Sequence, residues 1–525
     1  MSVSSFSAFR PRLPDLLALD ATSPGGRAVL TVYDRVGEMM LRRKFNRRSM
    51  RRWGSRAVVA LIVAMGVASA PAPPADAASD IWVDPSRGRD SAAGTRASPL
   101  RSLSEAWDRL PAIASTPTTV QLKAGDYRNL SPVYWEDHSG TSTAPVLIRS
   151  ADGKGRALLP AVNLFGVSWI EFRGIEFRDG GDVVHCEQCS HFTLRNSIVR
   201  GVGAQETFKA NQSEWVSILD SSLSGAGDNV VDMVAVRHVR LRRNRIAGAE
   251  DWCGYAKGGS MDVIVTSNLF TRCGTGGFSA GQGTGFQFME PPWLHYEAVG
   301  VVIRGNTVTE TEGAAFGVQG GFGVLVEDNV ARRVGRRSHV LEVVFGSRSC
   351  DGQPGDAGRD RCQQYLDQGG WGTTVVDDGS NGVSIPSRHV QFAGNVILNP
   401  APYRSTWQHL TVFGETGPQP GTGAPSDGAA DTDLRFHRNV IWNGTASMPL
   451  GVGEGSGCAP SNPTCNPAQL QADNRINTRL PLLKRLRNGR YVKRGWTVDY
   501  TRHTRLPPDW SGLPAGSPPW TSWPF

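Results

Sequence analysis

The chain has 525 residues, 39% of them hydrophobic and 61 of them glycine, a composition that excludes a disordered polymer and is typical of a globular protein rich in turns. Its formal net charge is +8, but residues 1–77 hold 12 basic and 5 acidic side chains, which leaves 44 and 43 for the remainder. Because the body is nearly neutral, we expect no nucleic-acid partner.

The N-terminal segment has the order of an export signal. An arginine-rich run at 41–56 precedes the apolar stretch AVVALIVAMGVASA at 57–70, and small residues follow at Ala75 and Ala77. This order is typical of a secretory signal peptide, so we predict cleavage after Ala77 and a secreted, extracellular protein. The apolar stretch is shorter than the about 20 residues that span a bilayer, so no membrane span is expected after cleavage; a retained signal anchor is the alternative.

The segment 78–117 contains a short helical pattern, SLSEAWDRL. Ser102 and Glu105 have the spacing of a capping box, and apolar residues follow at helical intervals. We interpret this segment as an N-terminal cap with a capping helix, followed by a first strand at 120–123.

A repeated phrase dominates the body: alternating apolar residues that lead to an asparagine. Successive copies begin at positions 170, 192, 216, 239 and 263, which are 22 to 24 residues apart. This period predicts a solenoid, and the alternation predicts one short strand per copy with one buried face. The asparagine is expected at the turn, because asparagine tolerates left-handed backbone. Such strands must stack in parallel to bury their faces, so the predicted fold is all-β, a right-handed parallel β-helix.

Two insertions interrupt the period. The interval between copies grows to 38 residues after position 263 and to 66 residues after position 324. Loops that leave a rigid scaffold commonly carry function. The predicted organisation is a leader at 1–77 with the signal peptide at about 41–77, an N-terminal cap at 78–117, the β-helix at 118–445, and an irregular C-terminal cap rich in proline, glycine and tryptophan at 446–525.

Eight cysteines, an even number, agree with an oxidising compartment. Cys253 and Cys273 are 20 residues apart, close to one coil, which places them on neighbouring rungs roughly 4.8 Å apart, within reach of a disulfide. The predicted disulfides are Cys253–Cys273, Cys350–Cys362 in the second insertion and Cys458–Cys465 in the tail.

The remaining cysteines, Cys186 and Cys189, follow His185 directly. These three residues could begin a zinc site, but a fourth ligand is not evident in the sequence. A tight or unpaired cysteine pair is therefore favoured.

Residues at equal offsets on stacked coils form vertical lines. Counting six or seven residues back from the first apolar position of each coil reaches His185, Lys209, Asp232, Lys257 and His295. The segments just before them add Glu206, Asp228, Glu250 and Asp251. This line indicates the wall of a cleft; the alternative is a ladder of surface ion pairs worth about 0–1 kcal/mol each.

Lysine on such a wall can serve as a base. Proton abstraction beside a carboxyl group needs a base whose pKa lies near ambient pH, and burial or a neighbouring cation brings lysine there. Lys209, two coils from Lys257 and roughly 9–10 Å away, could lower the pKa of Lys257 or hold a substrate carboxylate. Asp232 acts in the opposite direction, because a carboxylate stabilises the charged ammonium.

The segments IWVDPSRGRDSAAGTRASPLRSLSEAW (81–107) and VQLKAGDY (120–127), with the asparagine-bearing coils, resemble secreted right-handed β-helix proteins of the pectate-lyase-like superfamily, over roughly residues 80–445. The stretch GYAKGGSMDVIVTSNLF is similar to the segment around the catalytic lysine in a calcium-dependent pectate lyase family. This resemblance implies that Lys257 removes the proton at C5 of a uronate.

The chain departs from that family where an acidic calcium cluster is expected, because CGTGGFSAG stands at 273–281. No cofactor is required by the pattern, and calcium is doubtful, with Asp228 or Asp232 as substitute ligands only. Without calcium, cationic side chains must neutralise the substrate carboxylate. The candidates are Lys209 and Arg348.

The first insertion carries the aromatic segment PPWLHYE, in which Trp293 and His295 could bind a sugar. The alternative is a loop anchored by its own hydrophobic side chains.

Three functions remain open. The first is a polysaccharide lyase that cleaves an acidic, uronate-containing glycan by β-elimination. The second is a glycoside hydrolase, whose two opposed carboxylates could come from Asp228, Asp232, Glu250 and Asp251; the double-aspartate signature of β-helical polygalacturonases is missing from the sequence. The third is a non-catalytic glycan-binding or cell-surface solenoid. The expected partner is an acidic polysaccharide, and we expect a monomer.

Overall fold

The computed structural model describes residues 79–494, with gaps at 204, 351–356, 376–381, 406–408, 413–416, 418, 426–431, 445–449 and 451–465. The predicted signal peptide and the predicted Cys458–Cys465 disulfide lie outside the described residues. Among the described residues, no helix is long and apolar enough to cross a membrane.

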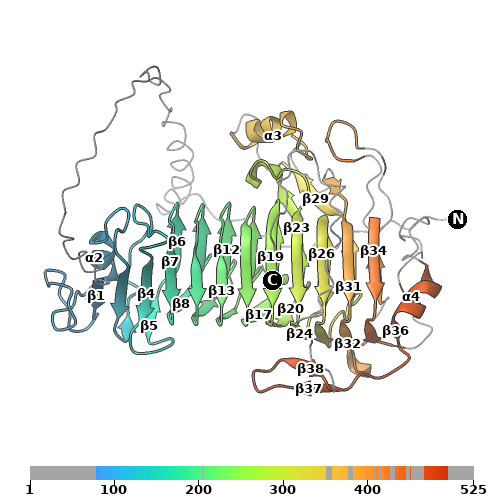
Figure 1. The fold of residues 1–525 in the computed structure, drawn as a ribbon, viewed down its shortest axis with the longest axis horizontal. Helices are drawn as coiled ribbons and strands as arrows, with labels where there is room; N and C mark the ends of the chain where they lie inside the picture. Colours follow the sequence, from blue (N-terminus) through green and yellow to red (C-terminus); the bar gives the residue numbers. More distant parts are fainter. Residues whose placement is uncertain are drawn as a thin grey trace, which may run out of the picture. The chain divides into compact units, whose positions relative to one another are not determined.

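The described chain winds into coils, and each full coil adds one strand to each of three parallel sheets (Figure 1). The first sheet has 12 strands: β1 (Ser79–Val83), β2 (Thr118–Leu122), β4 (Val146–Ser150), β7 (Ile170–Arg173), β10 (Thr193–Arg195), β13 (Ser217–Leu219), β16 (Arg237–Arg242), β19 (Ser260–Thr266), β23 (Ala298–Arg304), β26 (Gly321–Glu327), β31 (Arg388–Ala393) and β34 (Thr432–His437). The second also has 12: β3 (Gly125–Asp126), β5 (Ala157–Leu159), β8 (Glu176–Asp179), β11 (Ile198–Gly201), β14 (Ser222–Ser224), β17 (Arg245–Ala249), β20 (Leu269–Cys273), β24 (Thr307–Thr309), β27 (Val330–Arg332), β32 (Val396–Leu398), β35 (Val440–Trp442) and β36 (Arg475–Ile476).

The third sheet carries the candidate site and is called the nine-stranded sheet. Its strands are β6 (Val162–Phe165), β9 (Val184–Glu187), β12 (Phe208–Asn211), β15 (Val231–Val234), β18 (Trp252–Lys257), β21 (Gly276–Ala280), β25 (Phe316–Gln319), β28 (Leu341–Val344) and β33 (Leu410–Val412). The insertions hold β22 (Gly283–Gly285), β29 (Gly346–Ser349), β30 (Val383–Ile385), the 3-10 turn η1 (Phe286–Phe288) and helix α3 (Ala357–Asp367), and a second 3-10 turn, η2 (Ala401–Tyr403), follows β32.

The two ends of the coil are covered differently. Helix α2 (Leu103–Asp108) is capped by Ser102, whose side chain accepts from the backbone N–H of Glu105 as predicted. Strand β1 pairs with β2, so the first strand of the sheet lies inside the segment predicted as a cap. At the other end stands α4 (Pro467–Asp473), whereas the hairpin of β37 (Leu483–Arg485) with β38 (Tyr491–Lys493) lies along the second sheet, where Tyr491 bonds Thr307 of β24 (Figure 1).

The interior follows from the alternation in the sequence. Apolar side chains of equal position stack through the coil, as in the register Val239, Val263, Val301 and Val324, all of them buried. Each strand alone would expose this face, and stacking removes it from water.

Buried asparagines form a second stack, here called the asparagine ladder: Asn244, Asn268, Asn306, Asn329, Asn395, Asn439 and Asn474. Each amide before Asn474 donates to the next amide oxygen and to a backbone carbonyl, and the Asn474 amide donates to two backbone carbonyls. The asparagine itself does not adopt the left-handed backbone that we predicted. The residue before it does, as at Arg243, Ser267 and Asp328, and the asparagine side chain instead satisfies the backbone groups of the turn.

Replacing Asn306 by alanine is expected to lower the free energy of unfolding by about 2 kcal/mol, because the backbone N–H of Asn268 and the carbonyl of Val265 lose their buried partner. Urea denaturation measures this loss. The serine variant is the control, since Ser197 and Ser221 occupy the same position on earlier coils and Ser221 Oγ accepts the neighbouring N–H. Equal losses for alanine and serine would contradict this role of the side-chain oxygen.

Three disulfides are present among the described residues. Cys253 and Cys273 are bonded with a Cα–Cα distance of 5.3 Å, and Cys350–Cys362 ties β29 to α3, both as predicted. Cys186 and Cys189 are bonded to each other, so their sulfurs are not available to zinc. Disulfides agree with an oxidising compartment.

Candidate functional site

The predicted line of ionisable residues is present in part, on the outer face of the nine-stranded sheet. The register places His185, Lys209 and Asp232 side by side on successive strands. The next member is Tyr255, whereas Lys257 pairs with Val234, two residues further along the same strand. The turn after β18 is one residue longer than in the preceding coils, so a fixed count back from the next strand reaches the wrong position.

Lys209 lies among three carboxylates. Its Nζ is 3.4 Å from Glu206, 3.7 Å from Asp232 and 3.9 Å from Asp182. Burial opposes the charge of Lys209, but Asp232 and the other two carboxylates outweigh this effect and raise its pKa. Lys209 is therefore a fixed ammonium ion, already neutralised inside the protein. This arrangement argues against its predicted role as a partner for a substrate carboxylate.

The surrounding carboxyl groups have shifted pKa values. Burial, followed by a hydrogen bond with Glu206, raises the pKa of Asp182 to about 7. Burial raises the pKa of Asp232 to about 6, although Lys257 and Lys209 act against it. For Glu206, burial favours a higher pKa, but the hydrogen bond with Asp182 and the charge of Lys209 outweigh it, so the pKa is lowered. Neighbouring carboxyl groups thus share protons here.

Replacing Asp182 by asparagine is expected to stabilise the protein at pH 8 by about 1–2 kcal/mol and to change little at pH 4. Because the folded-state pKa of about 7 exceeds the ordinary value of 3.8, the folded chain keeps a proton that the unfolded chain releases. Stability therefore falls as pH rises from about 4 to about 7 and stays lower above that. Thermal unfolding of both variants across pH measures the difference; a gain in stability at pH 4 that vanishes at pH 8 would show the opposite sign.

Lys257 has different neighbours from Lys209. Its Nζ donates to Gln282 Oε1 at 3.1 Å and lies 4.5 Å from the centre of the Tyr255 ring. Gln282 in turn donates to Asp251 Oδ2 at 3.2 Å. Among the ion pairs of the described chain, none within 4.0 Å includes Lys257. Its closest oxygen partner is a neutral amide.

A buried ion pair holds the backbone next to Lys257. Glu297 accepts from the N–H of Gly258 at 2.9 Å and from the hydroxyl of Thr284 at 2.5 Å, and its other oxygen binds Arg348. Arg348 also donates to the carbonyls of His295 and Trp371 at 2.6 and 2.7 Å. Its side chain is 0% exposed, so the predicted contact of Arg348 with a substrate carboxylate is wrong.

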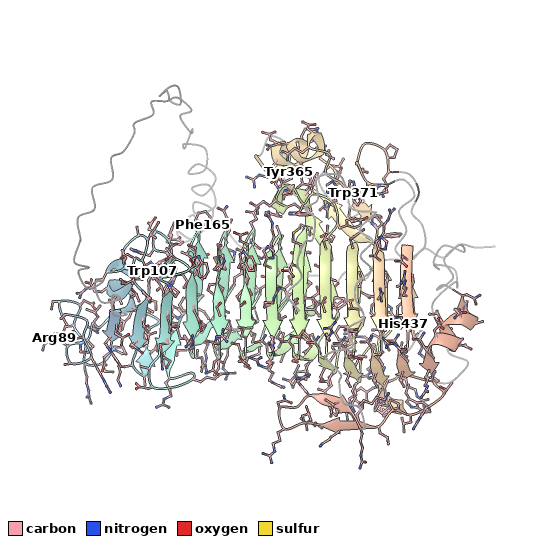
Figure 2. All side chains as sticks on the ribbon, in the orientation of Figure 1. Arg89, Trp107, Phe165, Tyr365, Trp371 and His437 are labelled. Atoms are coloured by element: carbon pink, nitrogen blue, oxygen red, sulfur yellow. A yellow bond between two sulfur atoms is a disulfide. The ribbon has the colours of Figure 1, made fainter. Side chains whose placement is uncertain are left out.

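The tryptophan and the tyrosine of the segment PPWLHYE are also buried. Trp293 is 6% exposed and packs with Tyr296, Phe322 and Trp371, the last of which is labelled in Figure 2. The ring of His295 packs against Trp371 at 5.2 Å, and burial together with Arg348 lowers the pKa of His295 to about 4. The prediction that Trp293 binds sugar is therefore wrong, because the loop uses this residue to anchor itself, as the alternative proposed. Sugar binding by the half-buried His295 stays a prediction.

The other predicted carboxylates divide into two groups. Asp228 and Asp251 lie in the cluster: burial raises the pKa of both, and the charges of Glu206 and Asp251 add to the effect at Asp228. Glu250 is exposed on the turn before β18, and no interaction in the described chain joins it to the cluster. His185 is half-buried, and burial with the charge of Lys209 lowers its pKa to about 4.

Sequence reasoning missed three residues of the site. Asp182 stands 24 residues before Glu206, one coil away, so the period could have identified it. Tyr255 was missed because the turn after β18 is one residue longer than in the preceding coils. Gln282 begins an insertion, where no period applies.

The calcium site that the resemblance implies does not fit these residues. The ammonium of Lys209 lies within 4.0 Å of Asp182, Glu206 and Asp232, where a cation bound by these carboxylates would have to lie. Across the described ranges, no group of three or more histidine, cysteine, aspartate or glutamate side chains is placed to hold a metal ion.

Comparison with known proteins supports the fold. Residues 161–336 match the family model described as "Right handed beta helix region". The fold is a right-handed parallel β-helix. This confirms the fold predicted from the repeat period and agrees with the resemblance to the pectate-lyase-like superfamily. No curated protein matches the sequence.

Solved β-helix structures similar to the chain include a rhamnogalacturonan lyase, an A-module of a mannuronan C-5 epimerase from Azotobacter vinelandii and a lacto-N-biosidase from Eubacterium ramulus. Their identities to this chain are 12%, 13% and 11%, and the TM-scores are 0.42, 0.39 and 0.34. The matches cover 69%, 66% and 70% of this chain and 87%, 92% and 68% of those structures.

Proposed function

We propose that the chain is a secreted carbohydrate-active enzyme that works on the outer face of the nine-stranded sheet, and that it cleaves an acidic glycan by β-elimination with Lys257 as the base. One observation carries this assignment: Lys257 is held by the neutral amide of Gln282, whereas Lys209 is surrounded by carboxylates. A general base must be able to accept a proton, and the closest oxygen to Lys257 Nζ is neutral, although Asp228, Asp232 and Asp251 lie within electrostatic range.

The reaction needs a proton acceptor and a proton donor. Neutral Lys257 takes the proton at C5 of a uronate, the electron pair forms the C4–C5 double bond, and the C4–O bond breaks. The leaving oxygen then needs a proton. We assign this proton to Asp251, whose pKa burial raises and whose carboxylate shares Gln282 with Lys257.

The charge on this face sets a condition for an acidic substrate. With Lys209 and Arg348 already paired inside the protein, ionised carboxylates outnumber free cations. Asp182, with a pKa of about 7, is neutral at mildly acidic pH and then donates a hydrogen bond instead of repelling a uronate, and the buried Asp232, with a pKa of about 6, no longer adds its negative charge. Acidic glycans are therefore expected to bind better at pH 5 than at pH 8.

Hydrolysis is the second candidate, and the carboxyl cluster favours it. The pKa of Asp182 is raised while that of Glu206 is lowered, so the face offers both a carboxylic acid and a carboxylate. Because Asp182 and Glu206 are hydrogen-bonded to each other, they are closer than the about 5–9.5 Å that glycosidases use. One of them would have to work with a more distant carboxyl group, such as Asp228.

One assay separates these reactions. The protein is incubated with polygalacturonate, alginate and chondroitin sulfate at pH 5 and pH 8, with and without chelator. Elimination produces an unsaturated uronate with ultraviolet absorbance and a matching number of reducing ends. Reducing ends without absorbance would establish hydrolysis. If the protein bound a glycan and formed neither product, it would be a non-catalytic glycan-binding protein.

A further inference from the structure

Two aromatic rings are exposed at the start of the nine-stranded sheet. Tyr134 is 56% exposed, and Phe165, which is labelled in Figure 2, is 38% exposed. Each stands next to a fully buried residue, since Trp135 forms a parallel bridge with Leu164 of β6 and both are 0% exposed. Because successive side chains of a strand point to opposite faces, Tyr134 and Phe165 lie on the outer face.

The two rings are on neighbouring rungs. The N–H of Trp135 donates to the carbonyl of Asn163, and the N–H of Phe165 donates to the carbonyl of Trp135. This register places Tyr134 beside Asn163 and makes Phe165 its diagonal neighbour, with the two Cα atoms roughly 8 Å apart. We call Tyr134 and Phe165 the aromatic platform.

The platform offers the faces of its rings to a ligand. In the described chain, no ring–ring contact includes Tyr134 or Phe165. Trp215 differs, although it is 43% exposed, because its ring is stacked between His191 and His238 at 5.4 and 4.0 Å. A ring stacked on both sides presents only its edge. Exposed apolar side chains that stand together indicate a binding surface.

Carboxyl groups border Phe165 on both sides. The bridge places Glu136 beside Phe165, and the register of β6 with β9 places Glu187 on its other side. Among the register neighbours of the platform there is no lysine or arginine, and Asn163 completes the set. Carboxylates repel a uronate, but they accept hydrogen bonds from the hydroxyl groups of an uncharged sugar.

These neighbours favour a sugar over a protein partner. The centre of a protein–protein interface is depleted in charged residues, whereas Phe165 stands directly between two glutamates. A sugar ring has an apolar C–H face and a rim of hydroxyl groups. An aromatic ring bordered by carboxylates and an amide matches both parts.

We propose that Tyr134, Asn163, Phe165 and Glu187 form a subsite for a neutral sugar unit. This inference rests on the proposed carbohydrate substrate, but not on the reaction at Lys257. The proposed substrate is then a glycan that carries neutral units as well as uronates.

The subsite lies at a distance from the proposed base. Phe165 and Lys257 belong to one line of register partners and are four rungs apart, roughly 19 Å at about 4.8 Å per rung. Between them the outer side chains of β15 are buried, with Asp232 at 4% and Val234 at 8%. Binding at the platform is therefore separate from the reacting group and can be measured without turnover.

The test compares charged and uncharged polymers immobilised on a biosensor surface at pH 7. Galacturonan is used both fully methyl-esterified, which removes its charge, and de-esterified, together with xylan, galactan and mannan. The wild type is expected to bind at least one uncharged polymer more tightly than de-esterified galacturonan. Phe165→Ala and Tyr134→Ala should each weaken this binding by about fivefold or more. Val133→Ala is the matched control, because Val133 is 78% exposed in the same loop and has no ring, and it should bind like the wild type.

The charge next to Phe165 gives a second readout. Glu136 is exposed, and Glu136→Lys places a cation beside the ring, so this variant should bind de-esterified galacturonan more tightly than the wild type does. Tighter wild-type binding to the de-esterified polymer, or equal binding of uncharged polymers by the wild type and Phe165→Ala, overturns the proposal. Self-association of the wild type that Tyr134→Ala abolishes also overturns it, because a second copy would then cover the rings.

The outcomes for the subsite and for the reaction are distinguishable. Binding of an uncharged polymer through Phe165, without cleavage of any acidic glycan, overturns the proposed reaction alone. Cleavage of an acidic glycan without binding of any uncharged polymer overturns the subsite alone. Absence of both binding and cleavage overturns both.

Discussion

Replacing Lys257 by arginine is expected to reduce kcat/KM as strongly as replacing it by alanine, by about 100-fold or more, the usual contribution of a general base. Arginine keeps the positive charge and can still donate to Gln282, but its guanidinium does not deprotonate in proteins. The comparison therefore separates a base from a cation that only attracts substrate. The measurement is the rate of ultraviolet-active product from the glycan that the wild type cleaves.

A distant lysine supplies the control. Lys154 is exposed on the turn before β5, and its alanine variant is expected to keep the wild-type rate. If Lys257→Arg retained most of the activity while Lys257→Ala lost it, Lys257 would act only through its positive charge. Another residue would then be the base, and the neighbouring Tyr255 would be the first to test.

The fold could be predicted because every coil must bury the apolar face of its strands in the same way. Alternating apolar residues leave each strand with one face to bury, and a period of 22 to 24 residues brings these faces into register, as for Val239 and Val263. The same logic correctly aligned His185, Lys209 and Asp232. Backbone pairing fixes these positions, so no knowledge of side-chain packing was required.

The site could be predicted only where the period holds. One additional residue in the turn after β18 moved Tyr255 into the line and Lys257 beside it. In the insertions, burial depends on contacts between segments far apart in sequence, such as Arg348 with Glu297 or Trp293 with Trp371. An arginine or a tryptophan in a loop can face a ligand or the protein interior, and its residue type alone does not show which.

Arg348 is expected to matter for stability more than for substrate binding. Arg348→Met should lower the free energy of unfolding by about 3–5 kcal/mol, because it leaves the fully buried Glu297 carboxylate without its cation and removes donors to the carbonyls of His295 and Trp371. Urea denaturation monitored by tryptophan fluorescence measures this loss, since Trp293 and Trp371 lie in the same insertion cluster.

Two further variants identify the cause. Arg337→Met removes an arginine from an exposed pair with Glu312, where the arginine side chain is 74% exposed, and should change stability by no more than about 1 kcal/mol. The double variant Arg348→Met with Glu297→Leu removes both buried charges and should recover part of the loss, because the desolvated carboxylate is then gone. The recovery will be incomplete, since Glu297 also accepts from Gly258 and Thr284 and so fixes the backbone beside Lys257. Equal losses for Arg348→Met and Arg337→Met would mean that the buried pair contributes no more than a surface pair, and the insertion would then owe its position to the Cys350–Cys362 disulfide and its apolar contacts.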